Sequence, residues 1–508
     1  MEVILKGYDV NGPTWFYLSL LLIIAVFFKF DRIWSLRNLD LALLLALAPG
    51  LLLVRSSEAT SAFGYAWLFV VTGAILVRLL SDSLFTRRPR LEQNLNASGM
   101  AFLCVSALAF QMTKVMTLEP HAAVIETARR ADDLLKRQDG TSASGLAKPL
   151  APLNTTVAQD TVAQNTLAQN TGATDKSPTD KSPADETTVA ALPDVRPGEN
   201  PRSSDARNVE TNDPGKPIES GPAGMLLATP IVQMTGGVTI WTTRTLAILA
   251  HLATCLGLIA VGRWHFSDTR IGLAMATLYL LLPITAFDVN KVTHLLPAAL
   301  IVWAFACYKT PSIAGVLLGL ACGSLFFAIF LLPVWLAFYW KRGAARFSIA
   351  LGGVVCVMLL CLIMTAADSH SLTRQIVGSI DWAVLKFDSG TGKGFWGQYD
   401  QSYRIPVFAV FMIMLTVITI WPLRKNLEHL MAHSAAIIVA TQFWYPHEGG
   451  VYILWYMPVM LIVMFRPRLA HLPPRSLDEP STLSTSGVSS RTRAGNSSST
   501  ALRTQFYR

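Results

Sequence analysis

The sequence predicts an all-α, polytopic transmembrane helical bundle. Hydrophobic residues make up 52% of the 508 residues and charged residues only 15%, a balance too apolar for a soluble chain of this size. Apolar runs recur at the length of about 20 residues that a helix needs to cross a bilayer. The net charge of +9 comes from Lys and Arg at the ends of these runs, which indicates membrane anchoring. We therefore expect membrane lipid as a partner and no nucleic acid.

The apolar stretches define about 11 to 13 spans. The first stretch has no signal-peptide cleavage pattern, so we expect it to remain as a span. The stretch 312–340 is longer than one span and divides either into two short helices with a bend near Gly323, or into one long tilted helix through Gly315, Gly319 and Gly323. The others lie near 14–30, 39–54, 64–85, 98–118, 245–262, 270–287, 294–308, 344–366, 405–421, 427–445 and 450–466.

The short loops fix an expected orientation, because cytoplasmic loops carry the excess of Lys and Arg. Alternate loops are rich in these residues, which makes that set cytoplasmic and places the N-terminus and 119–243 outside the cell membrane, with the C-terminus inside. The loops alternate between the two sides along the whole chain only if 312–340 forms two helices. Arg78 and Arg244 lie near span ends, where we expect them to extend to lipid headgroups.

Two membrane regions, 1–118 and 221–466, flank a polar insert. Residues 119–137 alternate charged and apolar side chains, which predicts an amphipathic helix on the membrane surface or in water. From 138 to 220 an imperfect repeat (VAQDT, VAQNT, LAQNT) is too polar to offset the entropy of ordering, so we expect a disordered extracytoplasmic insert. The cytoplasmic tail, 467–508, is also expected to be disordered.

Soluble-type catalytic motifs are missing from the sequence. The six cysteines lie within apolar runs without metal-ligand spacing, so we expect no metal site and no cofactor, with a divalent cation left open. Any function is therefore expected among the spans or the outer loops.

The stretch from Asp288 to Arg346 resembles the glycosyltransferase C superfamily, especially its alpha-mannosyltransferase-like branch that uses polyprenyl-phosphate sugars. The chain also resembles a planctomycete-type family of multi-pass membrane proteins, through GFWGQYDQSYRIPV at 394–407 and TQFWYPHEGGVYILWYMP at 441–458. The positions that carry the superfamily resemblance are Asn290, Lys309, Gly315, Gly319, Leu331, Leu332, Pro333, Lys341, Arg342, Trp455, Tyr456, Met457 and Pro458.

The resemblance implies sugar transfer from a polyprenyl-phosphate donor at the outer face. One position departs from the superfamily: where it places a Lys at the break between paired helices, this chain has GSLFF from Gly323. A phosphate there would need another donor, for which Lys291, His294 and Arg404 are candidates.

Glycosyl transfer also calls for an outer-face carboxylate that deprotonates the acceptor. The two catalytic candidates are Glu58, in the first outer loop, and Asp288. Asp288 shares a short loop with the candidate binding residues Asn290, Lys291 and His294, although a plain ion pair with Lys291 would also explain it. The other outer carboxylates are Asp381, Asp388, Asp400 and Glu448.

His447 and Glu448 form a second candidate binding group in an outer turn, surrounded by the aromatic residues Trp444, Tyr445, Tyr452, Trp455 and Tyr456. These aromatics fit either an interfacial belt or sugar stacking. Two other function classes stay open. A transporter would need ionisable groups at mid-membrane depth, for which His251 and His433 are the candidates, each also readable as a satisfied core histidine. A non-catalytic scaffold would use the insert for binding.

Overall fold

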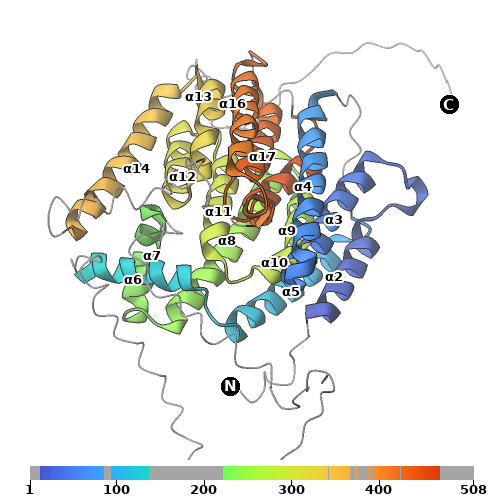
Figure 1. The fold of residues 1–508 in the computed structure, drawn as a ribbon, viewed down its shortest axis with the longest axis horizontal. Coiled ribbons are helices and arrows are strands. Elements are labelled where there is room, and N and C mark those ends of the chain that lie inside the picture. The colour runs from blue at the N-terminus through green and yellow to red at the C-terminus, as the bar shows by residue number, and fades with distance from the viewer. Residues whose placement is uncertain are drawn as a thin grey trace, which may run out of the picture.

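The computed structural model describes residues 12–84, 93–136, 221–340, 342–366, 373, 387, 394–423 and 425–469, and this part of the chain is helical without strands (Figure 1). Six of its helices are long and apolar enough to cross a membrane, and six shorter apolar helices accompany them. The predicted all-α, polytopic helical bundle is confirmed, and the chain is an integral membrane protein. The predicted disordered insert, 138–220, and the tail beyond 469 lie outside the described residues.

The elements in chain order are α2 (Gly12–Phe27), η1 (Phe30–Arg32), α3 (Leu36–Ser56), α4 (Glu58–Leu80), η2 (Ser81–Leu84), α5 (Ala97–Thr117), α6 (Ala122–Lys136), α7 (Pro222–Thr235), α8 (Ile240–His265), α9 (Thr269–Leu281), α10 (Pro283–Phe287), α11 (Val292–Ala306), α12 (Pro311–Ser324), η4 (Phe326–Leu331), α13 (Leu332–Tyr339), α14 (Ala344–Thr365), η6 (Gly394–Gly397), η7 (Gln401–Tyr403), α16 (Arg404–Ile420), α17 (Leu427–Trp444) and α18 (Ile453–Phe465).

Each predicted span corresponds to a helix within a few residues, and two of the stretches are divided. The stretch 270–287 breaks before Pro283, which starts α10 because proline suits a first helical position. The stretch 312–340 breaks at Leu325, whose φ of −152° and ψ of 135° are extended. The expected bend near Gly323 is thus confirmed, and the alternative of one long tilted helix is wrong.

Successive spans run in opposite directions, so their ends gather in two groups. The basic end of the bundle holds the last residues of α4, α8, α11 and α18, which are Leu80, His265, Ala306 and Phe465. The insert end holds the last residues of α3, α5, α9 and α17, which are Ser56, Thr117, Leu281 and Trp444.

A charged cluster of five side chains joins the two terminal parts of the chain at the basic end. Arg78 of α4 contacts both carboxylate oxygens of Asp40 on α3, at 2.7 and 3.0 Å, and lies 3.0 Å from Asp82. Arg466, after α18, pairs with Asp82 and lies 2.5 Å from Glu428 of α17. Burial lowers the pKa of Arg466 to about 10. The expectation that Arg78 extends toward lipid is wrong, because Asp40 and Asp82 hold it inside the bundle.

Helix α7 was not expected, although its boundaries carry clear signals. Pro222 is its first residue, and Gly236 ends it in the left-handed conformation with φ of 74°. Its start docks on the break in the 312–340 stretch, where the Gly221 N–H donates to Ser324 O at 3.0 Å. The approach is so close that a Cβ on Gly221 would lie 2.1 Å from Gly323 O. A glycine at 221 therefore fixes α7 against α12.

The predicted amphipathic helix is α6, which runs across the insert end rather than along the bundle (Figure 1). Its buried face, including Val124, Ala128 and Ala131, packs mainly on α7. Ion pairs with a spacing of four residues lie on the rest of its surface, among them Lys136 with Asp132 at 2.6 Å. The helix is therefore covered on one side by protein.

We expect Arg466→Met to lower the free energy of unfolding by about 3 kcal/mol, because removing one partner of a buried ion pair leaves an uncompensated charge. Unfolding of the purified protein by dodecyl sulfate in mixed micelles measures this change. Arg468→Met is the matched control, since Arg468 is exposed two residues further on. An equal loss of unfolding free energy in the two variants would contradict the conclusion that the charged cluster stabilises the fold.

We expect Gly221→Ala to displace α7 from α12, because the added Cβ meets backbone that cannot move aside as a flexible side chain would. The readout is labelling by a water-soluble maleimide of Ala223→Cys, which is buried between α12 and α14 in the undisturbed chain. Labelling should become faster in the Gly221→Ala background. It should stay slow with Gly352→Ala, because nothing lies within 4 Å of a Cβ there; unchanged labelling with Gly221→Ala would refute the docking.

Candidate functional site

The turn from Phe287 to Lys291 lies at the insert end and joins α10 to α11. Asp288, at its centre, is 4% exposed and pairs with Arg55 of α3. Lys291 lies 3.4 Å from the same carboxylate oxygen, and the Arg55 guanidinium also stands 5.6 Å from the centre of the Phe287 ring. One carboxylate therefore holds two cations in place at the end of the bundle.

Two further hydrogen bonds fix this turn. His251 Nε2 lies 2.9 Å from Val289 O, and the Tyr279 hydroxyl lies 2.8 Å from His251 Nδ1. A carbonyl can only accept, so Nε2 carries the proton and Nδ1 accepts from the tyrosine. His251 thus has the partners of a satisfied core histidine, the second of the two interpretations that the sequence allowed. On the other side, Asn290 Nδ2 donates to Glu119 O at 3.0 Å, after α5.

Aromatic rings pack behind the turn. The His294 ring lies 5.0 Å from Tyr452 and 5.8 Å from Trp455. Trp455 stacks on Tyr452 at 4.4 Å and on Phe327 at 4.6 Å, and only 1% of it is exposed. Trp455 therefore belongs to the packed core and offers no open face to a sugar. The Tyr445 ring lies 5.9 Å from the His447 ring, between centroids.

Arg404 lies apart from the turn and is fully buried. Its Nε donates to Trp444 O at 2.9 Å, at the end of α17, and its Nη1 donates to Gln401 at 3.0 Å. A cation at a helix C-terminus offsets the unpaired carbonyls and the helix dipole there. Arg404 therefore stabilises the fold locally and does not reach the 287–291 turn.

The remaining described candidates lie at three other places in the chain. Glu58 begins α4, with only Ser57 between α3 and α4, and the structure describes its backbone alone. Glu448 adopts a φ of 44° in the turn after α17. Asp400 caps η7 by accepting from Ser402 N at 2.9 Å, a bond that lowers the pKa of its carboxyl. Asp381 and Asp388 lie outside the described residues.

The structure thus brings together four of the predicted residues and adds one that was missed. Asp288, Asn290, Lys291 and His294 share the 287–291 turn and the start of α11. The added residue is Arg55, whose pairing with Asp288 joins positions 233 residues apart. No periodic pattern of residues in the sequence predicts a contact between positions so far apart.

No family model, no curated protein and no solved structure matches this chain.

Proposed function

We propose that this integral membrane protein transfers a sugar from a polyprenyl-phosphate donor at the membrane face formed by the insert end. The observation that carries the proposal is the pairing of Arg55 and Lys291 around Asp288, which gathers two cations at the insert end, the end that we propose meets the lipid headgroups. The resemblance to the glycosyltransferase C superfamily in the same stretch of sequence supports it.

The chemistry explains why cations are needed there. The acceptor hydroxyl loses its proton to a base and attacks the anomeric carbon, whose bond to the phosphate oxygen breaks. The departing polyprenyl phosphate gains one negative charge, because a phosphodiester becomes a phosphomonoester. Fixed cations stabilise the charge that develops in this step. Arg55 and Lys291 are the proposed donors to the phosphate.

We propose different roles for the two carboxylates. Asp288 already holds Arg55 and Lys291, so we assign it the positioning of these cations. Glu58 lies three residues after Arg55, at the start of α4, and is the proposed base. His294 and Asn290, next to the cations, are proposed to contact the sugar, while His447 and Glu448 border the acceptor side.

We expect Glu58→Gln to lower sugar transfer by about 100-fold, because a positioned general base contributes at least that factor. Purified protein is incubated with polyprenyl-phosphate mannose and host membranes as the acceptor source, and released polyprenyl phosphate is measured. Asp288→Asn should lower transfer as well, by freeing the two cations.

Asp268→Asn serves as the control for this assay. Asp268 caps α9 at the basic end, and asparagine caps a helix equally well. Absence of transfer by the unaltered protein with mannose and other hexose donors would reject the proposed reaction. Full activity of Glu58→Gln would reject only the assigned base.

The proposed orientation places the insert end outside the cell. We expect an impermeant maleimide to label Lys136→Cys in intact cells, and to label Lys309→Cys only after lysis. Both positions are exposed, and they lie at the insert end and the basic end respectively. Labelling of both cysteines in intact cells would show that the two ends of the bundle do not face opposite sides of the membrane. Labelling of Lys309→Cys in intact cells, with Lys136→Cys labelled only after lysis, would show that the insert end faces the cytoplasm.

A further inference from the structure

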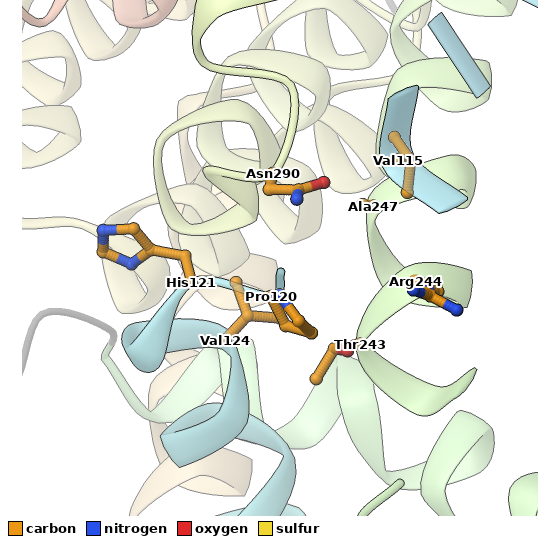
Figure 2. Close-up of a pocket in the computed structure, with 8 residues that line it drawn as sticks. All are labelled: Val115, Pro120, His121, Val124, Thr243, Arg244, Ala247 and Asn290. Carbon is orange, nitrogen blue, oxygen red and sulfur yellow. The ribbon is translucent and has the colours of Figure 1, made fainter. Parts of the chain in front are cut away.

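A small cavity opens on the other side of the same turn, between α5, α6 and α8. It is a half-open hollow that takes in about 190 Å³ with its solvent-filled mouth, and it is lined by Val115, Pro120, His121, Val124, Thr243, Arg244, Ala247 and Asn290 (Figure 2). Its lining contains one permanent cation and no acidic side chain. The space is therefore electropositive.

Arg244 is the source of this charge, and part of its hydrogen-bonding capacity is unused. Its Nε is buried without a hydrogen-bond partner in the part of the chain that the structure describes. The guanidinium lies 5.7 Å from the centre of the Trp241 ring, and Trp241 is itself 59% exposed. A buried polar atom that lacks a partner costs free energy, so a ligand that accepts from it would be stabilised.

Two other features favour an anion. The cavity adjoins the first turn of α8, where the helix dipole is positive. Asn290, on the opposite wall in Figure 2, uses one amide hydrogen for Glu119 O and has a second one to donate. The His121 ring extends away from Arg244 in this view and takes no part in the proposed site.

We propose that this cavity binds a phosphate group, with Arg244 and Asn290 as its donors. A planar guanidinium matches phosphate oxygens better than any other side chain. The group belongs either to an anionic phospholipid headgroup or to free phosphate. This site shares Asn290 with the residues proposed to contact the sugar, but the Asp288 carboxylate and its two cations do not line it.

The test uses the full chain purified in maltoside detergent, which contains no phosphate. It is titrated in separate arms with short-chain phosphatidylglycerol, with diacylglycerol of the same chain length, and with inorganic phosphate. Native mass spectrometry measures retention, and thermal unfolding measures stabilisation. We expect phosphatidylglycerol to bind and diacylglycerol not to bind, which identifies the headgroup; binding of inorganic phosphate alone identifies the free ion.

Arg244→Gln should weaken the retention of the bound probe at least about tenfold, the effect of one charge-assisted hydrogen bond. Arg263→Gln removes the same charge from the other, exposed end of α8 and should retain the probe fully. If Arg244→Gln does not fold, Asn290→Asp is used in its place. It should also weaken retention of the probe, because it puts a carboxylate in the cavity, and a carboxylate repels phosphate. Unchanged retention in the variant that folds, or no retention by the unaltered chain, overturns the proposal.

Discussion

The constraint that shapes this molecule is the need of every backbone polar group in lipid to find its partner inside the protein. Helices meet it within themselves, so the apolar spans need no polar side chains along most of their length. Among the described residues, the ion pairs that connect one span to another lie at the two ends of the bundle, while single hydrogen bonds such as that from Trp335 to Ser434 join spans between the ends. At the two ends, the charged cluster and the 287–291 turn each join helices that are far apart in the sequence.

The two ends of the bundle join distant helices through different arrangements of charge. At the basic end, Arg78 and Arg466 are shared among three carboxylates, and each charge is closely compensated. At the insert end, Asp288 faces both Arg55 and Lys291, and backbone carbonyls accept the other bonds, from His251 and Asn290. Buried pairs of the first kind fix a structure, whereas an excess of cations leaves capacity for an anion.

The span positions were predictable because apolar length is set by bilayer thickness and is local in sequence. The break at Leu325 was predictable for a related reason, since a stretch of that length exceeds one span and contains glycines. The partners of Arg78 and Arg466 were not predictable, because Asp82 and Arg466 are 384 residues apart and ordinary span-end arginines extend to headgroups. Within the site, the loop that unites Asp288 with Lys291 was visible in sequence, but Arg55 was not.

The missing lysine at the helix break gains a physical explanation from α7. Gly221 docks on Gly323 and Ser324, so the place where a cation would stand is filled by backbone. A side chain at 323 would also require Met358 to move, since the Met358 sulfur lies 2.2 Å from an added Cβ. A phosphate at this end of the bundle would therefore need cations from other elements, and in the two proposals these are Arg55 and Lys291 for the sugar donor and Arg244 for the second site. In these proposals, the glycine at the helix break and the extra cations at the insert end belong to the same arrangement for holding phosphate.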